Sequence, residues 1–248
     1  MMKLHLLGTS GYHPTRKRDT ACLMLPELGI LLDAGTGIFR ARELIQTPEL
    51  HIFLSHVHLD HVVGLTYLLD VLYQKAVEKV TVYCEPEKQP AIAENLFHRQ
   101  LFPVPPPFEF ADLRPGKFPA PGAGRLTVFP LRHPGGSLGF RFNWGNQSLA
   151  YVTDTTAARD SDYIAHLKGV DLLVHECYFP DGHESRAELT GHSCLTPVAE
   201  VARLADVGQL VLVHLNPLDE RDELLDLQSV SEIFPRIRIA RDEEVIEF

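Results

Sequence analysis

The chain has 248 residues, of which 45% are hydrophobic, and this is enough to bury a large core, so we predict one domain over residues 1–248. With 23 Lys and Arg against 33 Asp and Glu, the formal net charge is -10 at pH 7. This charge argues against broad nucleic-acid binding, because non-specific affinity depends on neutralising phosphates with Lys and Arg, and we expect no DNA partner.

The predicted elements alternate between strands and helices along the whole chain. In the first half, apolar runs predict strands near 2–7, 20–25, 29–33, 51–54 and 79–83, with helices near 37–46, 60–73 and 88–98. In the second half, we expect strands near 125–131, 138–143, 147–153, 171–175 and 210–213, helices near 160–168, 196–205 and 221–232, and closing strands near 236–247. This order fits an α/β fold in which two mixed β-sheets lie between helices, an αββα sandwich with its site along one edge. We expect the two halves to repeat one topology, although no sequence repeat shows it.

Three histidines and a carboxylate crowd together in the segment Ser55-His56-Val57-His58-Leu59-Asp60-His61. They follow a strand-like run and precede helical apolar spacing, so they lie on a strand-to-helix turn. His56 and His58 are two apart in an extended segment and can share one metal ion, while Asp60 and His61 can turn toward a second. The chain has 13 histidines, so the motif alone is not sufficient. A two-metal hydrolytic site needs further ligands from elsewhere in the fold.

Further candidate ligands directly follow strand-like runs. They are His133, after 126–131, Asp154, after 148–153, and His214, after 210–213. Taken singly, either histidine would more often be a structural, hydrogen-bonded residue, and the aspartate would more often cap a helix or turn. Together with the first motif, the three favour a metal site.

The order and spacing of these motifs resemble the metallo-β-lactamase superfamily, and within it the branch of ribonuclease Z, the tRNA 3′-processing endonuclease, and related phosphodiesterases. The resemblance rests on Leu7 to Gly11, Pro14 to Thr20, Ile30 to Gly35, the histidine-rich segment, His133 with Ser137 to Phe140, Thr153 to Thr155, Asp171 to Glu176, Gly191 to Ser193, and His214. It covers almost the whole chain and implies the metallo-β-lactamase fold.

The resemblance implies a centre of two divalent metal ions. One ion would be held by His56, His58 and His133, the other by Asp60, His61 and His214, with Asp154 bridging both. A hydroxide between the ions would be the nucleophile. Imidazole and carboxylate ligands without a thiolate suit zinc first, with manganese and iron as alternatives.

Three residues would act in catalysis by the same resemblance. Asp60 would orient or deprotonate the nucleophile besides ligating, and His192 would contact the scissile phosphate and protonate the leaving oxygen. Glu176 would orient His192. The alternative for His192 is a loop histidine capping the helix that starts near Thr196, and for Glu176 a buried salt bridge or helix cap.

The chain departs from the tRNA endonucleases between His133 and Asp154. Those enzymes carry an inserted arm in this interval that grips tRNA, whereas here the sequence predicts only a hairpin. We therefore expect a phosphodiesterase for a small or cyclic phosphodiester. One alternative is an armless nuclease for a short RNA end, and another is a hydrolase of carboxyl esters, thioesters or lactones, because the same centre can attack a carbonyl carbon.

Four cysteines, at positions 22, 84, 177 and 194, show no Cys-x-x-Cys spacing, and we interpret them as free buried thiols rather than ligands. No apolar stretch is long enough to span a bilayer, and no signal peptide is evident. We expect a cytoplasmic protein without a membrane partner. The resemblance adds the expectation of a homodimer.

Overall fold

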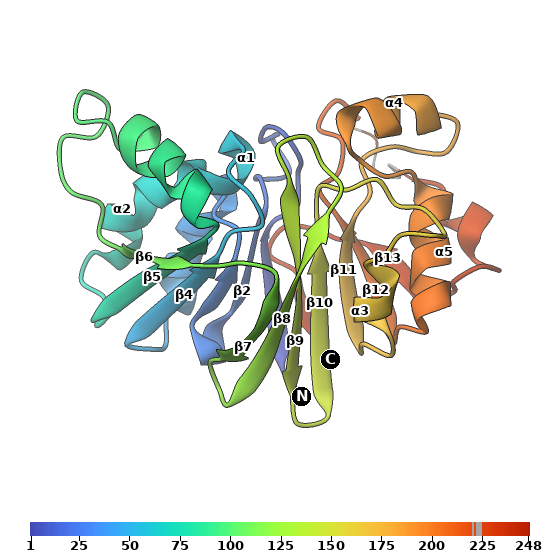
Figure 1. Ribbon diagram of the computed structural model, residues 1–248, viewed down its shortest axis with the longest axis horizontal. Helices are drawn as coiled ribbons and strands as arrows, with labels where there is room; N and C mark the ends of the chain where they lie inside the picture. The colour runs from blue at the N-terminus through green and yellow to red at the C-terminus, as the bar shows by residue number, and fades with distance from the viewer. Residues whose placement is uncertain (220, 222–224) are drawn as a thin grey trace. The chain divides into compact units, whose positions relative to one another are not determined.

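The computed structural model describes residues 1–219, 221 and 225–248, which form two compact units (Figure 1). The first unit comprises residues 2–114 and 241–247, and the second comprises residues 115–240 with residues 1 and 248. Each unit contains one seven-stranded sheet with helices. That these units form one domain stays a prediction.

The sheet of the first unit has the strand order β14-β1-β2-β3-β4-β5-β6. Its strands are β1 (Lys3–Gly8), β2 (Cys22–Leu25), β3 (Ile30–Leu32), β4 (Glu49–Phe53), β5 (Lys79–Cys84), β6 (Glu109–Asp112) and β14 (Val245–Glu247). The helical segments are α1 (Leu59–Val62), α2 (Leu68–Leu72), the 3₁₀ helices Pro26–Leu28, Thr36–Leu44, Val63–Tyr67 and Pro86–Lys88, and the π-helix Ala91–Leu96. Pairing is antiparallel from β14 to β3 and parallel from β3 to β6.

The helix expected over 60–73 is split into three short pieces, and a close backbone approach is the reason. The Gly64 amide donates to the Ala34 carbonyl at 2.8 Å instead of continuing an α-helical ladder. A Cβ atom at Gly64 would lie 2.1 Å from the Gly35 carbonyl oxygen, so only glycine allows this contact. The apolar residues of this segment are nevertheless buried as their spacing predicts, since Leu65, Leu68 and Val71 belong to the core of the first unit.

The sheet of the second unit has the order β13-β12-β11-β10-β9-β8-β7. Its strands are β7 (Gly116–Ala120), β8 (Gly124–Leu131), β9 (Ser137–Trp144), β10 (Gln147–Val152), β11 (Leu172–Glu176), β12 (Gln209–Val213) and β13 (Ile237–Ile239). The helices are α3 (Ile164–Leu167), α4 (Glu184–Thr190), α5 (Leu195–Ala205) and the 3₁₀ helix Leu227–Val230. The apolar face of α5, with Val198 and Ala202, packs on β11 and β12 (Figure 1).

The two units repeat one topology, as expected. From β7 to β10 the pairing is antiparallel, and from β10 to β13 it is parallel, which is the pattern of the first unit from β14 to β6. The expectation of two mixed sheets flanked by helices is therefore confirmed.

Several expected helices differ from the observed ones. The helix near 37–46 is a 3₁₀ helix, that near 88–98 is a 3₁₀ turn followed by a π-helix, and that near 160–168 shortens to α3. Part of the helix expected over 221–232 lies outside the described residues, and its remainder contains the 3₁₀ helix Leu227–Val230. Strands β6 and β7 and helix α4 were not predicted.

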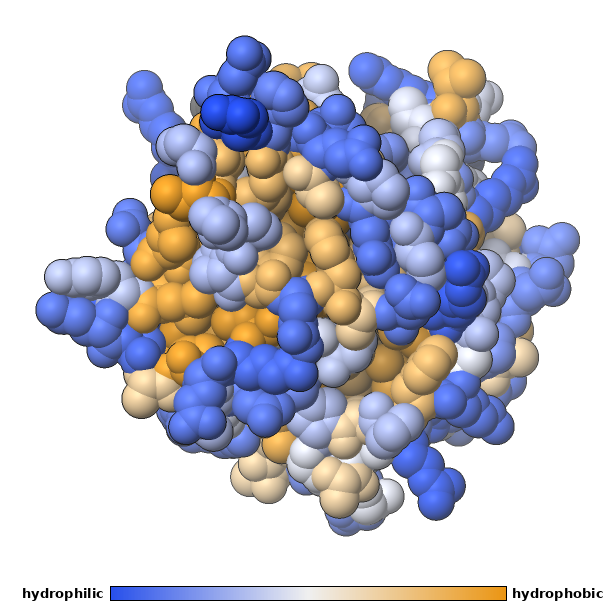
Figure 2. Space-filling model, turned by 60° about the vertical axis from the view of Figure 1, so that its left-hand side comes forward, coloured by the Kyte–Doolittle hydropathy of each residue, from blue (hydrophilic) through white to orange (hydrophobic). Residues whose placement is uncertain are grey.

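The first unit exposes apolar side chains on α2 and in the segment 101–104. Leu69, Leu101 and Val104 are 44%, 74% and 45% exposed, and Figure 2, with the left-hand side of Figure 1 turned forward, shows apolar surface on this face of the molecule. Among the described residues, no helix has the length and apolar character needed to cross a membrane.

Candidate functional site

In the first unit, His56 and His58 present ring nitrogens to one point. His56 Nε2 lies 3.0 Å from His58 Nδ1, and the rings meet edge to face with centroids 4.5 Å apart. The residues follow β4, and the backbone of His58 is extended, as the alternating spacing predicted. His56 is buried and His58 is exposed. Two nitrogens facing each other in this way can ligate one ion entering from solvent.

A buried carboxylate that the sequence analysis missed orders this segment. Asp33, directly after β3, is fully buried and has a φ of +58°. It accepts hydrogen bonds from the Ser55 amide and hydroxyl, and its Oδ2 lies 2.8 Å from His61 Nδ1. A carboxylate on one ring nitrogen fixes the tautomer and leaves the other as a ligand atom, the arrangement seen around metal-binding histidines. Its position in Leu32-Asp33-Ala34-Gly35, after a buried strand, was the available signal.

Asp60 and His61 lie in α1 beside each other. His61 Nε2 is 3.4 Å from Asp60 Oδ2, and the same oxygen accepts a hydrogen bond from the Tyr12 amide at 2.8 Å. Both residues are buried, and Asp60 is 9% exposed. The first unit thus gathers His56, His58, Asp60 and His61 on one short stretch of chain.

In the second unit, Asp154 lies between two histidines. Its Oδ1 is 3.6 Å from His133 Nε2, and its Oδ2 is 3.4 Å from His214 Nε2. All three side chains are at most 3% exposed. Asp154 has a φ of +50° and His214 one of +53°, so both occupy the left-handed region at strand ends, where non-glycine residues are strained. This carboxylate therefore offers a separate oxygen to each histidine.

His192 lies beside this cluster and contacts the carboxylate of Glu176. His192 Nδ1 lies 3.1 Å from Glu176 Oε1 and 4.0 Å from Asp154 Oδ1. Ligand atoms of Asp154, His192 and His214 all lie within 4.8 Å of one another. The ring of Tyr178, another residue that the sequence analysis missed, stacks on that of His192 at 4.8 Å.

The structure does not have His192 as a helix cap, whereas the buried salt bridge given as the alternative for Glu176 is present as its contact with His192. The Thr196 amide near the start of α5 bonds to Asp181 rather than to His192. Glu176 is fully buried and accepts hydrogen bonds from the Thr155 amide and the Ser193 amide. Its carboxylate is thus fixed by two backbone donors while it contacts His192.

The residues present fit divalent metal ions by their hydrogen bonding. His133 Nδ1 lies 2.9 Å from the Gly191 carbonyl oxygen and therefore carries the proton, which leaves Nε2, on the side of Asp154, as the ligand atom. His56 Nδ1 similarly contacts the Ser55 hydroxyl at 3.0 Å, and its Nε2 faces His58. Nitrogen and oxygen donors arranged in this way suit zinc and related ions.

The cysteines near this cluster take no part in it. Burial, with the nearby Glu176 carboxylate, raises the pKa of the Cys177 thiol well above its ordinary value, and burial raises the pKa of Cys194 to about 11. Both thiols stay protonated at neutral pH. A metal ligand or nucleophile must be a thiolate, so this agrees with the interpretation of the cysteines as buried apolar residues.

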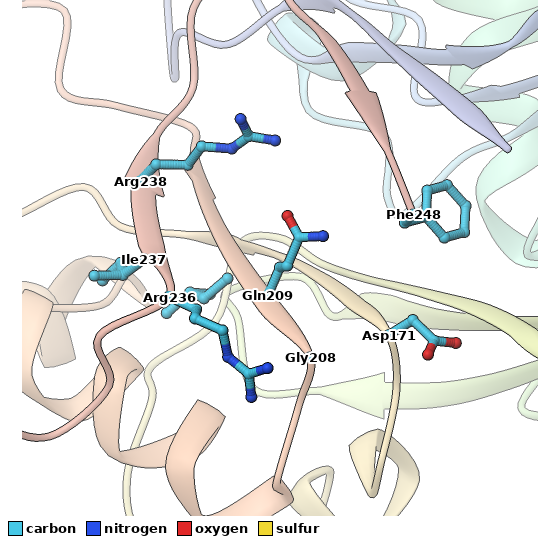
Figure 3. Close-up of a pocket in the computed structure, with 8 residues that line it drawn as sticks. Asp171, Gly208, Gln209, Arg236, Ile237, Arg238 and Phe248 are labelled. Carbon is cyan, nitrogen blue, oxygen red and sulfur yellow. The ribbon is translucent and has the colours of Figure 1, made fainter. Parts of the chain in front are cut away.

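A separate hollow of about 620 Å³ lies at the opposite ends of the parallel strands in the second unit (Figure 3). Its lining includes Asp171, Gln209, Arg236, Arg238 and Phe248. The lining contains no histidine, and Asp171 Oδ2 already accepts a hydrogen bond from the Ser148 hydroxyl. This hollow therefore lacks the ligands of a metal centre.

Comparison with known families identifies the class. The family model described as the beta-lactamase superfamily domain matches residues 29–215, more than half of the chain. The chain belongs to this superfamily.

Individual relatives agree with that class. The chain is 28% identical to "Ribonuclease Z" of Gemmatimonas aurantiaca, with 98% of this chain and 95% of the relative covered, and 28% identical to "Ribonuclease Z" of Metallosphaera sedula, with 98% and 97% covered. Both alignments, over 302 and 288 positions, are longer than this chain of 248 residues, so the relatives carry inserted segments.

Solved structures show the same fold. The metallo-β-lactamase fold protein YhfI from Bacillus subtilis superposes with a TM-score of 0.79 at 21% identity, with all of both chains covered. Human tRNase Z, short form, has a TM-score of 0.76 at 20% identity, with 99% of each chain covered. The predicted metallo-β-lactamase fold is confirmed, and the chain is a metal-dependent hydrolase of this superfamily.

Proposed function

We propose that this hydrolase is a dinuclear phosphodiesterase for a small or cyclic phosphodiester. The observation that carries the proposal is Asp154, whose two oxygens face His133 and His214 separately. A carboxylate placed in this way suits a pair of ions rather than a single one. We propose that His56, His58 and His133 hold one ion, that Asp60, His61 and His214 hold the other, and that Asp154 belongs to both.

Zinc ions, or manganese or iron ions in their place, would activate water and neutralise charge on the phosphoryl oxygens. The chain's own residues would supply orientation and protons. Asp60, with one oxygen held by the Tyr12 amide, would orient the attacking water. His192 would donate a proton to the leaving oxygen, and the fixed Glu176 carboxylate would keep His192 in place.

A small substrate is supported by what lies between His133 and Asp154. The structure has only β9 and β10 in this interval, joined by the two residues Gly145 and Asn146. No segment there extends beyond the sheet to clasp a large RNA. The net charge of -10 gives little general attraction for polyanions.

An endonuclease acting on a short RNA end is the second candidate. It is favoured by the two relatives named ribonuclease Z, which align with 98% of this chain. It would use the same residues, because attack on phosphorus is common to both reactions. The two candidates differ in how much of the substrate beyond the reacting phosphodiester must be bound.

The first experiment compares hydrolysis of bis(p-nitrophenyl) phosphate with that of a p-nitrophenyl carboxylic ester by zinc- and manganese-loaded protein. We expect diester hydrolysis and about two bound metal ions per chain. Asp154→Ala should lose both, with Asp154→Asn and circular dichroism as checks on folding. Turnover of the carboxylic ester alone would overturn the proposal in favour of a carbonyl hydrolase.

A further inference from the structure

Tyr12 has a backbone conformation that a bulky residue rarely adopts. Its φ is +58°, in the left-handed region. The His13 amide donates to the Gly11 carbonyl at 2.7 Å, so Tyr12 is the central residue of a tight three-residue turn. Strained turns of this kind persist only where surrounding contacts determine them, and they concentrate at functional sites.

The contacts that fix this turn lie within the first unit. The Ser10 amide donates to the Asp19 carbonyl at 2.8 Å, and the Ser10 hydroxyl donates to the His13 carbonyl at 3.0 Å. The Tyr12 amide donates to Asp60 Oδ2 at 2.8 Å. The turn is thus tied to a residue that we propose as a metal ligand.

The side chain of Tyr12 buries little surface in the folded protein. Its residue is 75% exposed, and its ring has an edge-on contact with His13 at a centroid distance of 5.8 Å. Burial therefore does not offset the strain of the turn. Because the Tyr12 amide touches Asp60, the ring lies within one side-chain length of that carboxylate. A group attached to a phosphate at Asp60 would be within reach of the ring.

We propose that Tyr12 is a specificity-determining residue whose ring stacks on a planar group, a nucleobase or an aryl group, of the phosphodiester. This inference rests on the proposed function in taking Asp60 as part of the site. An aromatic face accepts any base because every base has a π-face. The exposed guanidinium of Arg16, in the same loop, gives the loop a positive charge suited to a phosphate ester. The substrate class is then a nucleotide or aryl diester rather than a sugar or alkyl diester.

The direct test measures binding and needs no turnover. Zinc-loaded protein is titrated calorimetrically with adenosine 5′-monophosphate and with ribose 5-phosphate, which lacks the base. We expect the nucleotide to bind about 5- to 100-fold more tightly, in line with the strength of base stacking. Tyr12→Phe should keep this preference, whereas Tyr12→Gly and Tyr12→Asn, which suit a positive φ, should lose it. Tyr73→Ala, which removes a tyrosine that is 63% exposed elsewhere in the first unit, is the matched control and should keep it.

A second test uses turnover of two diesters with the same leaving group. We expect Tyr12→Gly to lower the ratio of kcat/KM for thymidine 5′-(p-nitrophenyl phosphate) to kcat/KM for ethyl p-nitrophenyl phosphate about 5- to 100-fold, because the leaving group common to both diesters cancels in this ratio. Equal binding of nucleotide and ribose phosphate by the unaltered protein, or a preference retained in Tyr12→Gly, overturns the role of Tyr12. Base-dependent binding without hydrolysis of either diester would overturn the proposed function and leave the role of Tyr12 standing.

Discussion

At the scale of single residues, three candidate histidines each have one ring nitrogen beside an acceptor, which leaves the other nitrogen for a metal ion or, in His192, for proton transfer. His61 contacts Asp33, His133 contacts the Gly191 carbonyl, and His192 contacts Glu176. His133, Asp154 and His214 could be predicted from sequence because each follows a strand-like run, whereas His192, after α4, was expected only from the family resemblance. Asp33 and the Gly191 carbonyl could not, since a backbone acceptor has no residue signature and a lone aspartate after a strand has many other roles.

Glu176→Gln tests the role of the carboxylate that holds His192. A neutral amide no longer attracts a protonated imidazole and cannot accept from both the Thr155 and Ser193 amides as well. We expect kcat for bis(p-nitrophenyl) phosphate to fall about 10- to 100-fold with KM and metal content nearly unchanged. Glu188→Gln, on the exposed side of α4, is the control and should leave kcat, KM and metal content unchanged. A loss of bound metal in Glu176→Gln would contradict a positioning role.

His175 predicts a pH dependence of stability. Burial lowers its pKa, because its ring is fully buried between the Tyr163 hydroxyl and the Glu176 carbonyl. The unfolded chain takes up a proton near the ordinary value of 6.5, whereas the folded chain does not, so stability is full above this pH and falls as the pH drops below it.

Urea unfolding of metal-free protein at several values between pH 8 and 5 measures this effect. The free energy of unfolding should decline below about pH 6.5 more steeply in the unaltered protein than in His175→Gln. Parallel declines in the two proteins would show that other groups cause the loss.

At the scale of elements, the strands that sequence reasoning identified are those with continuous apolar runs, such as β10 and β12, which are buried almost throughout. The missed elements lack this pattern. Every residue of β6 is at least partly exposed, β7 contains Pro119, and both are edge strands. In α4 only Ala187 is buried, so no apolar stripe marks a helix. Partial burial, rather than unusual backbone geometry, made these elements unpredictable.

The end of α4 couples this short helix to His133. Gly191 has a φ of +74°, and a Cβ atom there would lie 2.4 Å from Pro134 Cδ and 2.7 Å from His133 Nδ1. Gly191→Ala should therefore both strain the turn and displace His133, lowering stability by about 1–3 kcal/mol and reducing bound metal. Gly169→Ala, at a φ of +62° with open space around it, should show the backbone penalty with normal metal content. Thermal unfolding and metal analysis compare the two, and equal metal content would refute the coupling.

At the scale of the whole molecule, the repeated topology explains where the candidate residues lie. Asp33 follows β3 and Asp154 follows β10, and each strand is the fourth in its sheet, where pairing changes from antiparallel to parallel. Both aspartates have a positive φ. The repeat was expected from the order of elements, but the different tasks of the two aspartates depend on their neighbours, His61 for one and His133 with His214 for the other.

The exposed apolar side chains of the first unit bear on the predicted homodimer. Apolar surface gathered on one face often marks a contact between proteins. We expect light scattering to give a mass of twice 27.8 kDa, and Leu101→Asp to shift it toward the single chain. Leu189→Asp, at a residue on α4 that is 81% exposed, should leave the mass unchanged. A single-chain mass for the unaltered protein would contradict the prediction of a homodimer.

The salt dependence of hydrolysis distinguishes a small diester from RNA as the substrate. Each phosphate neutralised on a single strand contributes a slope of about -0.7 in log K against log salt, so one contact costs about threefold between about 50 and 200 mM salt, and many contacts cost orders of magnitude. With a charge of -10, we expect kcat/KM for a short RNA 3′ end to fall only about threefold over this range and not to rise with RNA length. Rates that increase with length and collapse with salt would require a basic track that binds many phosphates, and would favour the ribonuclease alternative over the small-substrate phosphodiesterase.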